Sequence, residues 1–384
     1  FLKMKKFSFL LALSFLVAPS FANERNFYSI NQQYIGVRPM AMGGAFSAVG
    51  GDYNTLFYNP AGLYDIEDKS LVVNLLTYGA STGDNSIADL YKDLRSASSQ
   101  SGSARTTELT RLVESKYGNY YHARLNTLSF HYTKPQSGFA FIPLDGSLSL
   151  KLDKQIGPTI KAEVTEHTTL AYGHAWSMDS VTPGLRVGVT GKATYHAYFA
   201  RVVPLIDYEQ NKDVVKSDYA QEGVSLDADL GFLHHKDFDS GSRLSSAVVF
   251  RNFFNTGYKQ DLHLINDNSS NPPDAQTRID LGVNYQLYKL WRFKPSFAFD
   301  LRDIGHENAN LMKTIHAGTE WKIDMGEHFH PSLMMGLNQG YLTAGVSLQT
   351  LWYLLEFATY GEEVGTKDGK KENRVNMFKF ALYF

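Results

Sequence analysis

The stretch Val224-Ser225-Leu226-Asp227-Ala228-Asp229-Leu230-Gly231-Phe232 decides the fold class, because apolar and polar side chains alternate along it. Successive side chains of a β-strand point to opposite faces, so a period of two predicts a strand with one apolar and one polar face. The same alternation recurs over 278–287, 293–302 and 314–323. The chain is therefore predicted to be all-β.

Followed along the whole chain, the alternation predicts about fourteen strands, an even number, as closed bacterial outer-membrane barrels have. Short turns follow the even-numbered strands, whereas most connections after odd-numbered strands are long. The exception is Gln339, which lies in a short connection after an odd-numbered strand. Short periplasmic turns and long external loops are typical of outer-membrane barrels. The expected strands are 70–79, 123–134, 138–151, 157–174, 184–200, 222–235, 242–255, 276–289, 291–302, 311–323, 329–338, 340–349, 351–361 and 373–384.

A soluble barrel or sandwich would alternate in the same way, so other observations favour the membrane. The strand count exceeds that of one small soluble barrel, and the charged face lies opposite the aromatic one. The last strand alternates through Phe378 and Phe380 and ends on Phe384, which looks like the C-terminal assembly signal of outer-membrane barrels; an ordinary strand ending in Phe is the alternative. We expect a transmembrane antiparallel β-barrel.

The N-terminus has the pattern of an export signal. It is basic from Lys3 to Lys6 and apolar from Phe7 to Ala18, and Ser20 and Ala22 form a small-x-small cleavage site. A membrane anchor is disfavoured, because a spanning helix needs roughly 20 apolar residues. We expect residues 1–22 to be a cleaved signal peptide and the protein to reach the outer membrane of a Gram-negative (diderm) bacterium.

Composition excludes several classes of function. The chain has 384 residues, with 37 Lys and Arg against 39 Asp and Glu, and no Cys. The absence of a basic excess argues against nucleic acid, and the absence of Cys excludes disulfides and thiolate metal sites. His234-His235 and His328-x-His330 lack a third ligand at a plausible spacing. We expect no enzyme, no cofactor and no metal, with outer-membrane lipid as a partner.

Between the export signal and the first strand, the sequence is rich in Gly and Ala and does not alternate. Residues 36–52 read GVRPMAMGGAFSAVGGD, and residues 59–63 read NPAGL. Together they resemble the N-terminal region of the FadL-like superfamily of outer-membrane proteins, which includes long-chain fatty acid and aromatic hydrocarbon channels and PorV-like relatives. The resemblance implies a hatch at 23–68 that closes a fourteen-stranded barrel at 69–384. The matching residues are Gly43, Gly44, Ala45, Asp52, Asn59, Pro60 and Ala61.

The residues of this region are physically compatible with a hatch. A barrel of this size lies between eight-stranded barrels filled by side chains and water-filled porins. Small residues let the backbone approach the wall, and the Asn59 amide can satisfy backbone groups that a compact loop would bury. A plain Asn-Pro turn is the alternative for Asn59. A nucleotide-binding loop is disfavoured, because the glycine spacing does not fit one.

The charged residues that alternate on the polar face of the strands, which is expected to line the barrel lumen, include both acidic and basic side chains. A mixed set favours salt-bridged contacts between wall and hatch over a path for charged substrates, since selectivity filters use rings of one sign. The residues are Arg186, Lys192, Asp227, Asp229, Arg243, Arg251, Asp280, Asp300, Arg302, Glu320, Lys322, Glu356 and Lys379.

The long connection 80–122 contains two apolar stripes at helical spacing. In hydrophobic-compound channels, helices in external loops offer a groove where the ligand first binds. Packing of the stripes on each other or on the barrel rim is the favoured alternative. The stripes include Ile87, Leu90 and Leu94, and Leu109, Leu112 and Val113.

The resemblance implies passive transport of hydrophobic small molecules, such as long-chain fatty acids or aromatic hydrocarbons, without a cofactor. The alternative is a PorV-like docking component of a secretion or surface-attachment apparatus, with a protein partner. A non-specific porin is less favoured, because a hatch leaves little open bore.

Overall fold

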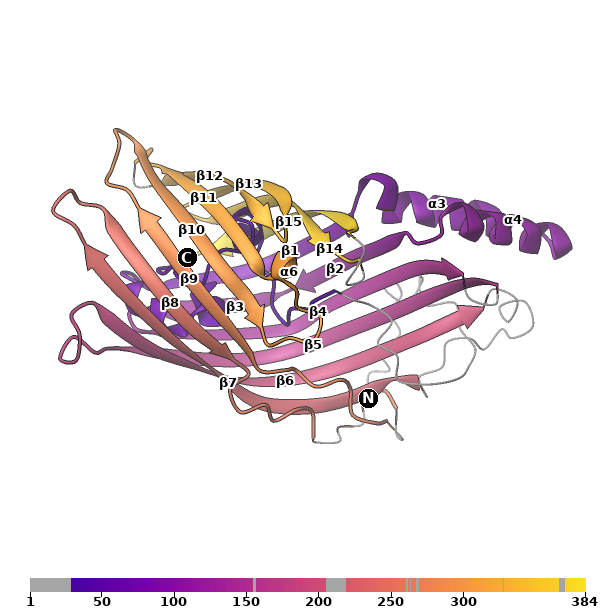
Figure 1. Ribbon diagram of the computed structural model, residues 1–384, viewed down its shortest axis with the longest axis horizontal. Helices are drawn as coiled ribbons and strands as arrows, with labels where there is room; N and C mark the ends of the chain where they lie inside the picture. The colour runs from indigo at the N-terminus through magenta and orange to yellow at the C-terminus, as the bar shows by residue number, and fades with distance from the viewer. Residues whose placement is uncertain are drawn as a thin grey trace.

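Fifteen strands form one antiparallel sheet in the computed structural model (Figure 1). It describes residues 29–154, 157–204, 219–259, 262, 264–266, 269–326, 328–365 and 370–384. The strands are β1 (Ser70–Ser81), β2 (Tyr120–Thr127), β3 (Ser129–Lys134), β4 (Ser137–Lys154), β5 (Pro158–Ser177), β6 (Leu185–Pro204), β7 (Gln221–Asp237), β8 (Arg243–Arg251), β9 (Arg278–Gln286), β10 (Phe293–Ile304), β11 (Ile315–Ile323), β12 (Phe329–Asn338), β13 (Tyr341–Thr350), β14 (Tyr353–Glu363) and β15 (Glu372–Tyr383).

The sheet closes on itself, because β15 pairs with β1. β2 and β3 both lie between β1 and β4, so the fifteen strands fill fourteen positions in the wall. The predicted barrel of about fourteen strands is confirmed. The single strand expected at 123–134 is instead divided at Leu128, whose φ of 54° is rarely adopted by a non-glycine residue and interrupts the ladder.

The two ends of the barrel differ as the loop lengths predict. Connections of two to seven residues lie at one end, at 135–136, 178–184, 238–242, 287–292, 324–328 and 351–352. The strand ends that the long connections join lie at the other end, together with those joined by the short connections 155–157 and 339–340. The long connections are 82–119, 205–220, 252–277, 305–314 and 364–371. In an outer-membrane barrel the short-turn end faces the periplasm.

The outward face of the wall is apolar and exposed. Tyr172 is 58% exposed and Leu226 57% exposed, and such side chains recur on most strands. All four tryptophans lie at or near the short-turn end and are at least 38% exposed, as in the aromatic girdle of a membrane barrel. A continuous apolar exterior of this extent requires lipid rather than water. The fold is that of a transmembrane β-barrel.

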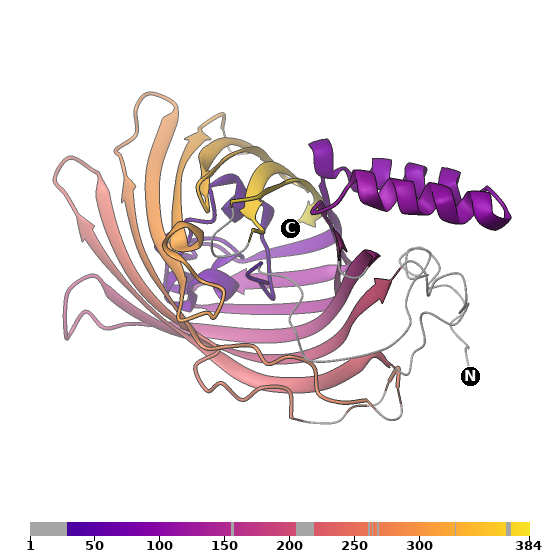
Figure 2. The same cartoon turned by 45° about the vertical axis from the view of Figure 1, so that its right-hand side comes forward.

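Short helices lie inside and outside this wall. The segments α1 (Val37–Ala41), α2 (Thr55–Tyr58) and η2 (Pro60–Asp65) contact the inner face of the strands, and Figure 2 shows this indigo segment enclosed by the barrel. Helices α3 (Ile87–Ser98) and α4 (Gly102–Ser115) form a hairpin that extends beyond the wall (Figures 1 and 2). The remaining short helices are η3 (Gly83–Asn85) and α6 (Leu311–Thr314). No helix in the described part of the chain is long and apolar enough to cross a bilayer.

Candidate functional site in the barrel lumen

Residues 36–66 are packed against a belt of inward-facing glycines on the wall. A Cβ atom added at any of these glycines would lie within 3.0 Å of an atom of residues 36–66. At Gly188 it would lie 2.3 Å from the Pro60 carbonyl carbon, and at Gly318 it would lie 2.2 Å from the Met42 oxygen. Glycine in a strand interior marks such close approaches of another backbone. We call these residues the glycine belt: Gly138, Gly173, Gly188, Gly231, Gly282, Gly318, Gly336 and Gly345.

The Gly43-Gly44 pair makes the closest approach from the side of the segment. Both residues have positive φ, 67° and 81°, a conformation that favours glycine. A Cβ at Gly43 would lie 2.4 Å from the Ala317 carbonyl oxygen. The wall satisfies the carbonyls of the turn, since Nδ1 of His316 lies 2.8 Å from the Gly43 oxygen and Nη1 of Arg302 donates to the Gly44 oxygen at 2.9 Å.

Asn59 and Asp300 hold the backbone that follows. One Asp300 carboxylate oxygen accepts the N–H groups of Phe46 and Ser47, at 2.8 and 2.7 Å. The Asn59 amide donates to the Ser47 oxygen at 2.7 Å and accepts the Ala61 N–H at 3.0 Å. These side chains satisfy backbone groups of a buried, irregular segment, which would otherwise cost free energy.

A buried ion pair ties the start of the segment to the wall. Arg38 donates through Nε and Nη2 to the Glu320 carboxylate, at 2.8 and 2.6 Å, and through Nη1 to Asp52 of the same segment at 2.5 Å. Glu320 is 1% exposed. Because an unpaired charge at this depth is strongly unfavourable, Arg38 and Glu320 depend on each other.

A second polar link runs through Tyr53. Its hydroxyl donates to Glu356 at 3.2 Å and accepts from Lys379 at 2.9 Å, so a carboxylate of β14 and an ammonium of β15 share one hydroxyl of the segment. Arg251 also donates to the carbonyl oxygens of Phe57 and Tyr58. The segment is therefore held by hydrogen bonds from many strands.

Most other inward charges pair within the wall, which differs from the expectation of wall-to-hatch salt bridges. Lys192 lies 2.8 Å from Asp229, and Arg251 and Arg278 pair similarly with Asp280 and Asp303. Adjacent strands bring these residues closer to each other than to any charge of the segment, which has few. The segment is held mainly through its backbone carbonyl and N–H groups.

Two arginines of the predicted lumen set lie instead at the short-turn end. Arg186 pairs with Asp179 at 2.8 Å, and Arg243 with Asp237 at 2.6 Å. Hydrogen bonds from Ser177 and Arg186 hold the pKa of the Asp179 carboxyl well below its usual range. Both pairs stabilise turns outside the membrane.

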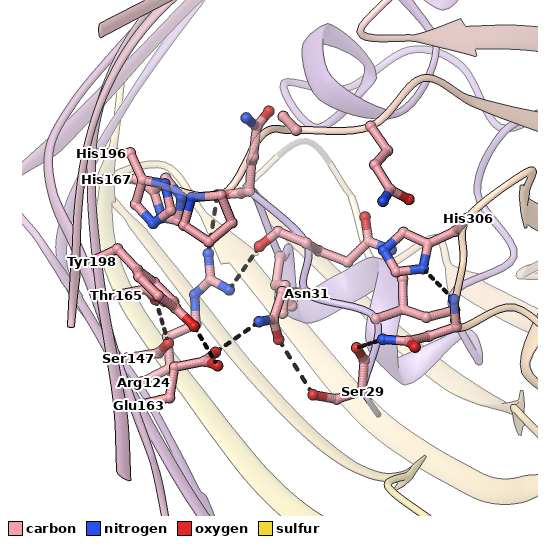
Figure 3. A pocket seen from close by; sticks show the side chains of 18 of the residues that line it. Ser29, Asn31, Arg124, Ser147, Glu163, Thr165, His167, His196, Tyr198 and His306 are labelled. Atoms are coloured by element: carbon pink, nitrogen blue, oxygen red, sulfur yellow. Dashed lines mark hydrogen bonds between the residues drawn. The ribbon is translucent and has the colours of Figure 1, made fainter. Parts of the chain in front are cut away.

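Above residues 36–66, on the long-loop side, the lumen contains a cavity of about 160 Å³ lined by Ser29–Gln33, Ile35 and several strands and loops. Arg124 crosses its floor, with Nη2 2.6 Å from the Asp145 carboxylate and 3.1 Å from the Gln33 oxygen. Figure 3 shows Asn31 and Tyr198 both directed at the Glu163 carboxylate, at 2.9 and 3.1 Å. This part of the lumen is polar.

The strand ladder of the wall is interrupted at Leu128, between β2 and β3. Here β1 changes partner, pairing with β3 up to Asn74 and with β2 from Thr77. On the inner side, the Asn74 amide donates to the Asn126 side-chain oxygen at 2.7 Å, and Ser129 donates to the same oxygen at 2.9 Å. Side chains thus substitute for missing ladder bonds.

The two stripes of the first long loop lie outside the lumen. They are buried against the outer face of β2, β4 and β5 at the long-loop end, in a cluster that contains Tyr121, Leu150 and Ile160. Leu94 packs on this cluster, and Leu112 is 7% exposed. The stripes therefore contact protein, and their role in first contact with a ligand stays a prediction. The buried stripe residues of the cluster are Ile87, Leu90, Leu109 and Val113.

Sequence reasoning missed the cavity residues and the glycine belt. Inward-phase polar residues such as His167 and His196 were visible but did not stand out from an ordinary polar lumen. Glycines within alternating strands were a usable signal of close backbone approach. Among the described residues, no three His, Asp or Glu side chains are grouped so as to hold a metal ion.

No family model matches the sequence, and no curated protein matches it. Among solved structures, the chain is similar to the CymD monoaromatic hydrocarbon channel at 10% identity, covering 91% of this chain and 96% of that one, with a TM-score of 0.47. It is similar to the Pseudomonas putida toluene transporter TodX at 9% identity, covering 92% and 98%, with a TM-score of 0.46.

A further similar structure is CdiB from Escherichia coli, at 9% identity and a TM-score of 0.35, with 80% of this chain covered. The chain spans only 63% of the length of that protein. At TM-scores this low the likeness concerns barrel architecture in general and does not bear on ligands or partners. A Pseudomonas aeruginosa FadL homologue is also similar, at 8% identity and a TM-score of 0.30, with 93% of this chain and 99% of that one covered. The closed strand ladder of the chain itself establishes the fold.

Proposed function

We propose that this protein is an outer-membrane barrel through which hydrophobic small molecules move passively, with residues 1–22 removed as a signal peptide, 23–68 acting as a hatch and 69–384 as the barrel. The observation that carries the proposal is a closed barrel with an apolar exterior whose lumen is filled on the short-turn side and hollow on the long-loop side. A filled lumen excludes free diffusion of ions and large solutes, whereas the cavity can receive a small molecule.

The route has three parts. A ligand is captured at the long-loop end, where the α3–α4 hairpin lies, and enters the cavity. Residues 36–66 then block direct passage, so release needs either movement of the hatch or an opening in the wall. The divided strand at Leu128 supports the second exit, because side chains of Asn74, Asn126 and Ser129 replace ladder hydrogen bonds there.

Flux measurements on purified protein test this proposal. Liposomes with and without the protein are loaded with a reporter, and uptake of toluene, an alkane and a long-chain fatty acid is followed over time. We expect faster uptake of at least one of these compounds by liposomes with the protein, without any energy source. Equal uptake of all three compounds by both kinds of liposome would contradict the proposal.

A second candidate is a docking role in a secretion or surface-attachment apparatus. The α3–α4 hairpin favours it, since it extends beyond the barrel and carries exposed charged residues such as Lys92 and Arg111. Crosslinking in outer membranes, compared between the intact chain and a variant lacking 87–115, tests this role. A stoichiometric protein partner lost with the hairpin supports docking, and unchanged crosslinking argues against it.

A further inference from the structure

The cavity above the hatch is lined by an excess of negative charge. Its described lining includes two guanidinium groups, no lysine and five carboxylates. Arg124 is bonded to Asp145 at 2.6 Å and Arg278 to Asp303 at 2.9 Å, so both positive charges are opposed by carboxylates. Carboxyl groups therefore outnumber basic side chains in the described lining of the cavity. The five carboxylates are Asp145, Glu163, Asp274, Glu362 and Glu363.

Aromatic and imidazole rings line the same cavity. His167 and His196 stack with ring centroids 4.2 Å apart, and Tyr258 lies 5.0 Å from His196. Tyr198 lies 5.8 Å from His196 on its other side. The faces of such rings attract apolar groups and cations. The cavity thus combines a surface for the apolar body of a ligand with carboxylates for a positive group.

His196 lies within this group of rings. It is 6% exposed, and neither of its ring nitrogens has a hydrogen-bond partner among the described residues. Both nitrogens are themselves buried, so this side chain contributes to the cavity through its ring and not through a hydrogen bond to a ligand.

We propose that this cavity binds a small organic cation, an amine whose ammonium group faces the carboxylates and whose apolar body lies against the rings. The inference deepens the proposed function by naming the ligand class of the same lumen, and it rests on that function for the passage of the ligand. Anions, including fatty acid carboxylates, are disfavoured by the same charges. Lys192 does not offset them, because it pairs with Asp229 at 2.8 Å, whereas buried Lys313 interacts electrostatically with one of them, Glu363.

Three probes of similar size test the charge preference on the wild-type protein: phenethylamine, phenethyl alcohol and phenylacetate. Each is titrated into detergent-solubilised protein by calorimetry. We expect the amine to bind on the order of tenfold more tightly than phenylacetate, and more tightly than the alcohol, with a preference that falls as salt is raised. Tighter binding of the alcohol or the acid, or absence of amine binding, overturns the inference.

A double variant locates the binding site. Glu163→Gln with Asp274→Asn removes two carboxylates that line the cavity, and we expect amine affinity to fall on the order of tenfold while affinity for the alcohol stays the same. Glu108→Gln on the exposed face of α4 is the matched control and should change neither. An unchanged amine affinity in a folded double variant contradicts the assignment; if that variant does not fold, the wild-type probe series decides.

The outcome is separable from that of the proposed function. Flux of toluene into liposomes without amine binding would overturn the cation site and leave transport standing. Amine binding without flux of any compound would overturn transport and leave the cation site standing.

Discussion

Two halves of one lumen differ in how they meet the wall. On the short-turn side, residues 36–66 are packed against the glycine belt, and wall side chains satisfy their backbone groups. On the long-loop side, the wall carries imidazoles, tyrosines and carboxylates around a cavity of about 160 Å³. The strands continue through both halves, so the difference comes from the residues on the inner face. Inward-facing glycines let the backbone of residues 36–66 approach the wall closely. Large polar side chains keep other parts of the chain away from the wall, so a cavity remains between them.

The difference also concerns how each half is stabilised. In the filled half, Arg38 and Glu320 depend on each other in a site that excludes water. In the hollow half, His196 has no hydrogen-bond partner among the described residues. The lining side chains of the hollow half lie beside a cavity of about 160 Å³, whereas the filled half packs its wall against backbone. Substitutions should therefore act on stability in the filled half and on binding in the hollow half.

The largest effect is expected from breaking the buried pair. Arg38→Met leaves the Glu320 and Asp52 carboxylates without the guanidinium that they share, and we expect a loss of about 3–5 kcal/mol in the free energy of unfolding. Removing the Glu320 charge as well, with Arg38→Met and Glu320→Gln together, should recover part of the loss. Unfolding in urea, followed by loss of the heat-modifiable band, measures this.

The control for this pair is an exposed one. Arg243→Met breaks the pair between Arg243 and Asp237, whose side chains are 42% and 66% exposed, respectively. It should lower the free energy of unfolding by roughly 0–1 kcal/mol. Equal costs for Arg38→Met and Arg243→Met would show that the filled half is not sealed from water.

A smaller effect is expected from adding one methyl group to the glycine belt. Gly188→Ala places a Cβ 2.3 Å from the Pro60 carbonyl carbon, and we expect a loss of about 1–3 kcal/mol in the free energy of unfolding from the forced shift of residues 36–66. Gly191→Ala lies on the same strand, and its added Cβ meets nothing within 4 Å. The Gly191 variant should unfold like the wild type. If both variants unfold at the same urea concentration, the close approach at Gly188 is wrong.

Two buried histidines compare the halves directly. His316→Phe removes the hydrogen bond to the Gly43 oxygen, and we expect a loss of about 1–3 kcal/mol. His196→Phe removes two ring nitrogens that have no described hydrogen-bond partner and keeps an aromatic ring, so it should change the free energy of unfolding by less than about 1 kcal/mol. Urea unfolding of both variants checks this. A reversed order of stabilities would contradict the division of the lumen.

The smallest effect concerns a turn outside both halves. The pKa of Asp179 is lowered in the folded state, so its ionised form contributes stability that is full above its usual value of 3.8 and is lost as pH falls toward the folded value. We expect Asp179→Asn to lower the unfolding midpoint slightly at pH 7 and less so in acid. The midpoints of variant and wild type, measured across pH, test this. A constant difference at all pH values would exclude the carboxylate as its cause.

Much of the barrel was predictable from sequence. Alternation such as that of 224–232 sets which face meets lipid, and a strand cannot slip by one residue without exchanging its faces. The division at Leu128 was not predictable, because residues on both sides of it continue the strand pattern. Its unusual φ depends on the change of partner made by β1.

The candidate site was less predictable. The NPAGL and MGGA motifs indicated which residues pack closely against the wall, because small residues and Asn-Pro occur where the backbone is crowded. Which strands meet it depends on long-range register, as when Gly318 comes to lie opposite Met42. The cavity is formed by residues from many strands and from 29–35, and no local pattern brings those residues together.

The central claim, a lumen sealed by residues 36–66 and open above them, is tested most directly by cysteine accessibility, since the chain has no native Cys. Asn31→Cys places a thiol at an exposed position beside the cavity. Ser47→Cys places a thiol at a position that is 0% exposed and packed against the glycine belt. With a membrane-impermeant maleimide added at the long-loop side, we predict rapid labelling at position 31 and labelling at position 47 only after unfolding. Equal labelling rates at both positions in the folded barrel would contradict the claim.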